Sequence, residues 1–155
     1  MATQKIKPCL WVEKDAMAAA HYYLSIFKDG KLIEYNDYKG FSSPSGDFDM
    51  ATIPILGIDF QILAAGPLFK FNEAVSFAVV CKDQAEVDYY WEALTANGGE
   101  ESVCSWLKDK YGLSWQIVPD ALYELEKHPD DKKRLYALNA MMKMKKIIIA
   151  DLEEK

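Results

Sequence analysis

Residues 104–119, CSWLKDKYGLSWQIVP, hold two tryptophans, a Lys-Asp-Lys run and a single glycine within a short stretch. Polar and apolar side chains alternate beside the glycine, as they do in paired strands, so we expect a hairpin closed at Gly112. The charged residues 108–110 are expected to form its exposed rim. Whether this hairpin is a binding site or only scaffold depends on which side chains share a face.

Strand alternation divides the second half of this stretch between two faces of a sheet. If Gln116 faces one side, Ser114 faces the same side, whereas Trp115 and Ile117 face the other. A buried amide or hydroxyl without a hydrogen-bond partner costs about 1–3 kcal/mol, so Ser114 and Gln116 need water, each other or a ligand. Trp106 and Trp115 are expected to pack in the core or at a subunit interface.

We expect an internal duplication, because both halves of the chain show the same order of elements. The motif V-x-K-D occurs at residues 12–15 and again at residues 80–83. In each half a buried strand leads through an aspartate into an amphipathic helix, and further strands follow. The expected helices begin at Asp15 and Asp83, and the expected strands are residues 8–12, 31–38, 47–56, 60–65, 75–81, 103–108 and 113–118.

The expected organisation is a single domain over residues 1–155 that contains two modules and an extension. The first module spans residues 5–66, the second spans residues 74–119, and a helical extension spans residues 120–155. This extension should pack on the sheet or on a second subunit through an apolar helical stripe. The stripe comprises Leu135, Leu138, Met141 and Met142.

Composition and charge exclude several classes of protein. The formal net charge is −6, and no basic run is available to follow a nucleic-acid backbone. No stretch reaches the roughly 18 apolar residues of a membrane span, and the N-terminus lacks the apolar region of a signal peptide. We therefore expect a cytoplasmic protein with neither a nucleic-acid nor a membrane partner.

The chain has three cysteines, Cys9, Cys81 and Cys104. They form no Cys-x-x-Cys pair and leave one residue over, which argues against a disulfide framework and against a zinc ribbon. Cys9 and Cys81 lie in apolar runs, where burial raises the pKa of a thiol and disfavours a nucleophilic role. All three are expected to be reduced core residues.

Three segments resemble one known family. They are PCLWV at residues 8–12, GPLFKFNEAVSF at residues 66–77 and WLKDKYGLSWQIVP at residues 106–119. They are similar to the PhnB-like family of the vicinal oxygen chelate superfamily, which includes glyoxalases, bleomycin-resistance proteins and extradiol dioxygenases. The resemblance implies an α+β fold in which two βαβββ modules form a curled mixed sheet around a cup, and it implies a homodimer.

Members of this superfamily often hold a divalent metal in the cup through His or Glu side chains. Carried over to this chain, the ligand positions fall at Pro8, Ser76 and Gln116, with a further one near Ala64 or Ala65. None of these residues offers an anionic or imidazole donor, and a metal site normally needs three or four of them. We therefore expect neither a metal nor another cofactor.

Two functions of different class fit the resemblance. The first is a metal-free binding protein of the bleomycin-resistance type, which holds a small, partly apolar molecule. The second is an enzyme of the same superfamily with an unconventional or metal-dependent site. A third hypothesis is a pure assembly module whose cup is filled by its own side chains. The expected ligand-binding residues are Leu10, Phe69, Phe71, Asn72, Ser76, Ser114 and Gln116.

Structural roles remain open for some of these residues. Ser76 and Gln116 either orient a ligand or hydrogen-bond to each other between strands, and Asn72 and Glu73 either serve a site or cap a turn. Some family members are named as methyltransferases of the ubiquinone pathway. The sequence does not support that activity, because no glycine-rich turn connects a strand to a following helix.

Overall fold

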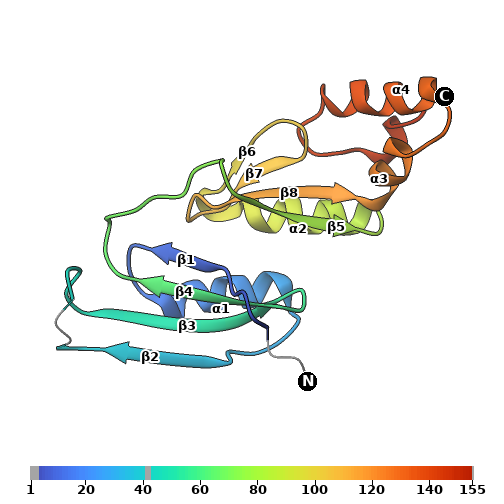
Figure 1. Cartoon of the computed structure of the whole chain (residues 1–155). Helices are drawn as coiled ribbons and strands as arrows, with labels where there is room; N and C mark the ends of the chain where they lie inside the picture. Colours follow the sequence, from blue (N-terminus) through green and yellow to red (C-terminus); the bar gives the residue numbers. More distant parts are fainter. Residues whose placement is uncertain (1–3, 41–42, 155) are drawn as a thin grey trace. The chain divides into compact units, whose positions relative to one another are not determined.

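The computed structural model describes residues 4–40 and 43–154. Contacts divide the chain into two compact units, Met1–Lys70 and Phe71–Lys155 (Figure 1). Each unit has its own four-stranded sheet. Among the described residues, no helix combines the length and apolar character needed to cross a membrane.

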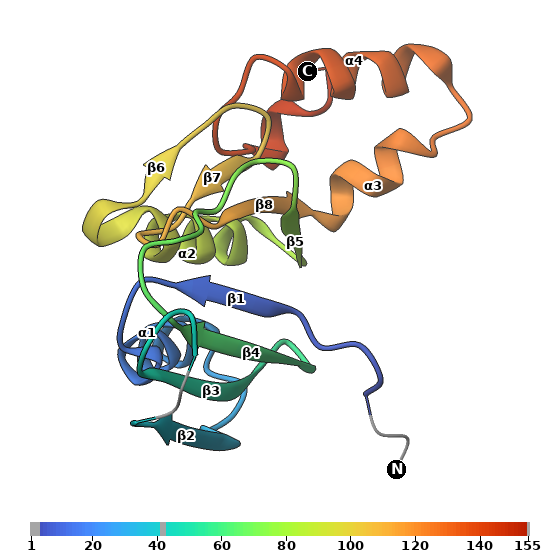
Figure 2. The same ribbon diagram turned by 60° about the vertical axis from the view of Figure 1, so that its left-hand side comes forward.

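The first unit is a four-stranded sheet with one helix packed on it (Figure 2). The strands lie in the order β1-β4-β3-β2, in which β1 runs parallel to β4 and the other neighbours are antiparallel. The elements are β1 (Cys9–Val12), α1 (Ala16–Phe27), β2 (Glu34–Tyr38), β3 (Phe48–Ile55) and β4 (Ile58–Ala64).

The second unit repeats this topology. Its strands lie in the order β5-β8-β7-β6, with β5 parallel to β8 and the other neighbours antiparallel. The expected pair of βαβββ modules is therefore confirmed, each with its own mixed sheet. The elements are β5 (Ser76–Cys81), α2 (Gln84–Thr95), the short helix η1 (Ala96–Gly98), β6 (Glu100–Glu101), β7 (Trp106–Lys108) and β8 (Ser114–Pro119).

The strand expected at residues 103–108 is wrong in its first half. Cys104 and Ser105 have φ angles of 55° and 71°, in the left-handed region that does not continue a strand. The chain therefore turns between β6 and β7, and only Trp106–Lys108 pairs as β7. The two-residue strand β6 was not expected from the sequence.

The repeated V-x-K-D motif has a physical explanation at its last residue. Asp15 accepts a hydrogen bond of 2.8 Å from the backbone N–H of Ala18, and Asp83 accepts one of 2.9 Å from Glu86. Both aspartates thus satisfy a backbone donor in the first turn of a helix that would otherwise lack a partner. The expected helix starts are confirmed.

Asp109 is a buried carboxylate, although the sequence predicted an exposed rim at this position. The residue is only 2% exposed. Its Oδ1 accepts hydrogen bonds from the backbone N–H groups of Tyr111, at 2.8 Å, and Leu113, at 3.1 Å. Its Oδ2 accepts one from the indole Nε1 of Trp115, at 2.9 Å. The rim prediction holds for Lys110, which is exposed, and fails for Asp109 because three donors converge on its carboxylate.

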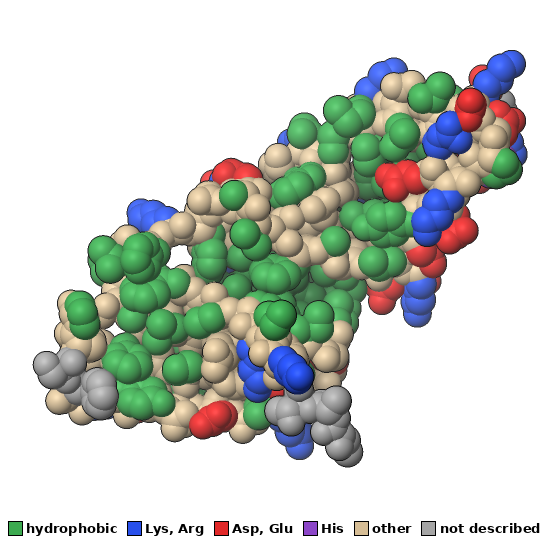
Figure 3. Space-filling model, viewed as in Figure 1, with side chains coloured by type: hydrophobic (Ala, Val, Ile, Leu, Met, Phe, Trp, Pro, Cys, Tyr) green, Lys and Arg blue, Asp and Glu red, His purple; other side chains and the backbone are tan. Residues whose placement is uncertain are grey.

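The C-terminal extension packs on its own unit and adds a second small core. Lys, Arg, Asp and Glu side chains gather on the outside of this region (Figure 3). Its elements are α3 (Asp120–Glu126), α4 (Asp131–Met141) and the short helix η2 (Ile149–Asp151). Its core comprises Val118, Leu122, Leu125, Ala137, Ile147 and Leu152.

Two members of the apolar stripe expected on α4 do not pack on the chain's own unit. Leu135 is 55% exposed and Met142 is 63% exposed, whereas Ala137 is the buried residue of this helix. The segment that follows α4 docks on α2. The Gln84 amide donates to the carbonyl of Ile147 at 3.0 Å and accepts from the N–H of Ile149 at 2.8 Å.

The substitution Asp109→Asn tests the buried carboxylate. An amide keeps one acceptor oxygen but turns an NH₂ group toward a backbone or indole donor, so at least one hydrogen bond becomes a clash of donors. We expect the free energy of unfolding to fall by about 2–4 kcal/mol in urea titrations. The same carboxyl-to-amide change at the exposed Glu92 should alter it by less than about 0.5 kcal/mol. Equal effects of the two substitutions would contradict the assigned role.

Candidate functional site

The candidate site lies on the sheet of the second unit, on the side opposite α2. We call this side the distal face. The side that α2 covers carries Val79, Trp115 and Ile117, which are fully buried. Because side chains alternate along a strand, their neighbours point to the distal face. The distal face comprises Ser76, Ala78 and Val80 of β5, Trp106 and Lys108 of β7, and Ser114 and Gln116 of β8.

A cavity of about 560 Å³ borders this face at the β6 and β7 side. The volume lies within the range of roughly 300–1,000 Å³ that is typical of small-molecule sites. The residues that line it include Glu73, Glu100, Val103, Trp106, Lys108 and Ser114. The cavity thus combines one aromatic side chain, three carboxylates, one ammonium group and the hydroxyls of Ser102 and Ser114.

Ser114 is the most informative residue of the cavity. It is 1% exposed, and its Oγ has no hydrogen-bond partner among the described residues. In the sheet it lies opposite Lys108 on β7 and opposite Ser76 on β5. A buried hydroxyl without a partner costs about 1–3 kcal/mol, so a group that enters the cavity and bonds to it would recover that free energy.

Lys108 forms an ion pair with Glu73, from the segment that precedes β5. The hydrogen bond from Lys108 lowers the pKa of the Glu73 carboxyl, and the same bond raises the pKa of Lys108. The Glu73 side chain is exposed, and the Lys108 side chain is half-buried. Such a pair in contact with water is weak and exchanges partners readily.

Gln116 and Ser76 satisfy each other on the distal face. The Gln116 amide Nε2 donates a hydrogen bond of 2.8 Å to the Ser76 Oγ. This is the hydrogen bond between strands that was one of the two expected roles for these residues. Both side chains lie on the same face as Ser114. Asn72 likewise takes its structural role, because its Oδ1 accepts from the N–H of Ala74 at 2.9 Å and closes a turn.

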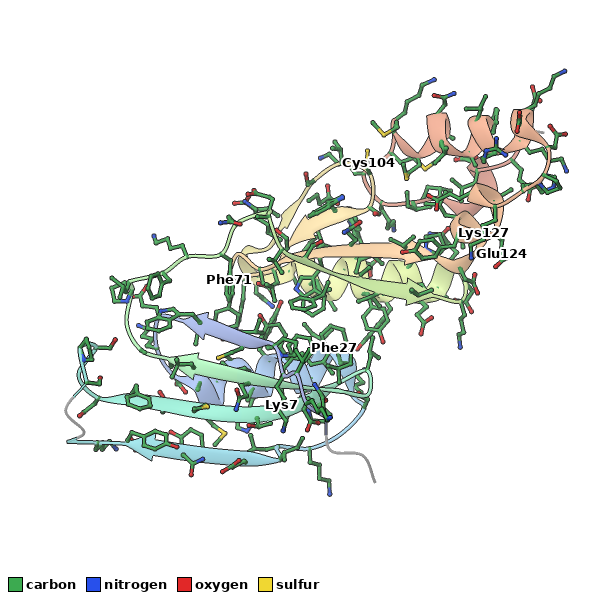
Figure 4. The ribbon with its side chains drawn as sticks, in the orientation of Figure 1. Lys7, Phe27, Phe71, Cys104, Glu124 and Lys127 are labelled. Atoms are coloured by element: carbon green, nitrogen blue, oxygen red, sulfur yellow. The ribbon has the colours of Figure 1, made fainter. Side chains whose placement is uncertain are left out.

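Two of the remaining expected residues, Leu10 and Phe69, belong to the first unit, and Phe71 belongs to the second. Leu10 is 3% exposed and lies beside Ile62 on the side of the first sheet that α1 covers, so it is unavailable to a ligand on the opposite side. Phe69 is exposed and packs edge-to-face on Trp11, with ring centroids 4.9 Å apart. Phe71 is half-buried in the segment before β5 (Figure 4).

Sequence reasoning left the role of Glu73 open and did not assign Trp106, Lys108 or Glu100 to the site. Trp115 is buried as expected, but Trp106 is half-buried and lines the cavity. The sequence alone could have identified two of these four residues. Trp106 and Lys108 are two positions apart on one expected strand, so their side chains share a face. No sequence signal identified Glu100, because β6 has only two residues.

The positions implied for a metal do not fit one. Ser76 and Gln116 are neutral and already bonded to each other, and Pro8 and Ala64 have no side-chain donor. Divalent ions in such sites are held by carboxylates, imidazoles or thiolates. Among residues 4–40 and 43–154, no group of three or more His, Cys, Asp or Glu side chains could hold a metal ion.

The cysteines differ in environment. Cys81 is fully buried, and burial raises the pKa of its thiol to about 12, which leaves almost no thiolate near neutral pH. The expectation of a core residue is confirmed for Cys81 and is wrong for Cys9, which is exposed on β1. Cys104 is half-buried on the turn between β6 and β7 and lines the cavity (Figure 4).

A family model described as 3-demethylubiquinone-9 3-methyltransferase matches residues 4–118 of this chain. The match includes both modules and ends at the last strand of the second sheet. The chain belongs to this PhnB-like family of the vicinal oxygen chelate superfamily. No curated protein is significantly similar to it.

Solved structures agree with this PhnB-like assignment. A PhnB protein from Bacillus cereus that carries the same methyltransferase name is 27% identical, with a TM-score of 0.65 over 75% of this chain and 99% of its own. A Pseudomonas aeruginosa protein, 16% identical, has a TM-score of 0.61 over 76% and 98%. The fosfomycin resistance protein FosX from Listeria monocytogenes, 21% identical, has a TM-score of 0.61 over 83% and 100%. The last two likenesses establish the glyoxalase-like fold alone.

The substitution Ser114→Ala tests the unpartnered hydroxyl. Removing a buried group that has no partner should raise the free energy of unfolding by about 1 kcal/mol in the ligand-free protein. Ser102→Ala, at an exposed position of the same cavity, is the matched control and should leave stability within about 0.5 kcal/mol. A loss of stability in Ser114→Ala, measured by urea denaturation, would mean that the hydroxyl is already bonded.

Proposed function

We propose that this PhnB-like protein is a metal-free, cytoplasmic homodimer that binds a small, partly apolar molecule, in the manner of bleomycin-resistance proteins. One observation carries the proposal. Ser114 lines a cavity, and its buried hydroxyl has no hydrogen-bond partner among the described residues, while the neighbouring Ser76 and Gln116 bond to each other. A binding site explains an unsatisfied buried group that a purely structural role does not.

The lining of the cavity supports an amphipathic ligand. Trp106 and Val103 supply apolar surface, and Lys108 and Ser114 supply polar groups from neighbouring strands. Small-molecule sites are commonly built in this way, with apolar walls and a few polar groups that orient the ligand. Regular strands hold both polar residues, so the site is preorganised rather than assembled on a loop.

The neutral side chains at the metal-ligand positions that the resemblance implies favour binding over metal-assisted catalysis. Gln116 and Ser76 occupy positions at which metal-holding relatives are expected to have acids or imidazoles. A neutral amide and a hydroxyl bind divalent metals weakly, and the hydrogen bond between them already uses one lone pair of Ser76. The donor chemistry of these residues therefore suits an organic ligand.

The homodimer is supported by the edges of the two sheets. Among the described residues, β1 pairs only with β4, and β5 pairs only with β8. Val75 and Val80, at and beside β5, are exposed. An unpaired edge with exposed apolar side chains is a template for association, which a second copy of the chain would cover.

An enzyme of the same superfamily is the alternative. A FosX variant from Listeria monocytogenes has been solved with Mn(II) and 1S,2S-dihydroxypropylphosphonic acid, and it is 18% identical to this chain with a TM-score of 0.56. The fold therefore accommodates a metal and a small polar molecule in other proteins. Metal binding by this chain would favour the enzyme.

Thermal-shift measurements separate these two functions. Protein purified without chelator should show no rise in melting temperature with Mn²⁺, Zn²⁺, Ni²⁺ or Fe²⁺, because ions that do not bind the native state do not stabilise it. Small amphipathic metabolites that fit the cavity should raise the melting temperature by several degrees.

Two variants serve as controls for this measurement. Ser114→Ala should abolish the metabolite shift, and Glu92→Gln, at an exposed position outside the cavity, should keep it. A saturable shift with one metal, at micromolar concentration, would contradict the metal-free proposal. Sedimentation at the same protein concentration should give twice the chain mass of 17.6 kDa, and a monomer would contradict the homodimer.

A further inference from the structure

We propose that the ligand of the distal-face cavity is cationic, a small protonated amine that carries an aromatic or similar apolar group. This inference deepens the proposed function and rests on it. Its ammonium group would lie between the Glu73 and Glu100 carboxylates and bond to Ser114, and its apolar part would contact Trp106. Each of these four residues lines the cavity.

The charges around the cavity favour a cation. Three carboxylates, those of Glu73, Glu100 and Glu101, line it together with one ammonium group, that of Lys108. Glu101 is engaged elsewhere, because it accepts from the Trp91 indole at 2.9 Å and from Lys145 at 3.3 Å. With Glu73 paired to Lys108, the charge of Glu100 remains without an ion pair among the described residues. An anion that entered would meet this negative charge, whereas a cation would be attracted.

The sheet register places the polar groups in one row. Glu100 lies opposite Lys108, and Lys108 lies opposite Ser114. A primary ammonium has three N–H donors and no acceptor, so it needs acceptors on several sides. The Glu73 and Glu100 carboxylates and the Ser114 hydroxyl supply such acceptors.

Ser114 and Trp106 give this site two features that a chance cluster of acidic residues would lack. Ser114 lines the cavity, and its buried Oγ has no hydrogen-bond partner within the described part of the chain. Trp106 adds an indole, the ring that attracts cations most strongly among aromatic side chains. The other three indoles, of Trp11, Trp91 and Trp115, each donate to a protein acceptor.

The Lys108–Glu73 ion pair would compete with a cationic ligand. Lys108 holds Glu73 at the cavity in the absence of ligand. A cationic ligand would compete with Lys108 for the same carboxylate and would be repelled by its charge. Replacing Lys108 by a neutral residue should therefore strengthen the binding of an amine, and it should weaken the binding of an acid.

Three probes of similar size and different charge test the inference: phenethylamine, 2-phenylethanol and 3-phenylpropionate. Their dissociation constants would be measured by ¹H–¹⁵N NMR titration of the full chain, with the Trp106 indole signal as reporter. We expect phenethylamine to bind about tenfold more tightly than 2-phenylethanol, because attraction between an ammonium group and a nearby protein carboxylate in water is of that size. We expect 3-phenylpropionate to bind most weakly.

Variants of the lining residues locate the effect. Glu100→Gln should weaken the binding of the amine about tenfold and leave the binding of the alcohol unchanged. Lys108→Gln should strengthen the binding of the amine severalfold. Ser114→Ala should weaken both the amine and the alcohol. Glu92→Gln, an exposed position of α2 outside the cavity, is the matched control and should change nothing. The spectra of the variants also report whether each one is folded.

The possible outcomes test the cationic ligand and the proposed binding function separately. Tighter binding of 3-phenylpropionate, or weaker amine binding by Lys108→Gln, would overturn the cationic ligand and leave a binding cavity in place. Equal affinities for all three probes would overturn it as well. If no probe shifts a resonance of the distal face, both the cationic ligand and the proposed function fail at this cavity.

Discussion

The buried carboxylate of Asp109 is the interaction on which the second unit depends. It accepts three hydrogen bonds, from the backbone of Tyr111 and Leu113 and from the indole of Trp115. Two of these bonds shape the turn between β7 and β8, and the third fixes the largest side chain of the core. Because the turn sets the register of a hairpin, this carboxylate also determines which residues of β7 and β8 lie opposite each other.

The same hairpin therefore makes both the core and the cavity. The register places Leu107 opposite Trp115 on the side that α2 covers, and Lys108 opposite Ser114 on the distal face. A shift by one residue would exchange the two faces and bury a lysine. The scaffold and the site are thus two sides of one short motif, and a substitution at Asp109 would affect both.

The fold could be predicted from sequence, and parts of the site could not. Repeated V-x-K-D motifs marked both modules, because an aspartate that caps a helix is a local signal that needs no tertiary contact. The burial of Asp109 depends on three donors that converge only after the turn forms, so a Lys-Asp-Lys run was interpreted as a solvated rim. The burial of Leu10 depends on the register of β1 with β4, a partner distant in sequence, so the sequence of β1 alone does not reveal it.

The central claim is that the distal face holds an organic ligand and no metal. Native mass spectrometry of the chain, purified from cells without chelator and sprayed from volatile buffer, tests it most directly. The account predicts a species at twice 17.6 kDa with no bound metal, from which collisional activation releases a small molecule, and Ser114→Ala should lack this molecule. A stoichiometric divalent metal retained by the native species, with no organic occupant in any preparation, would contradict it.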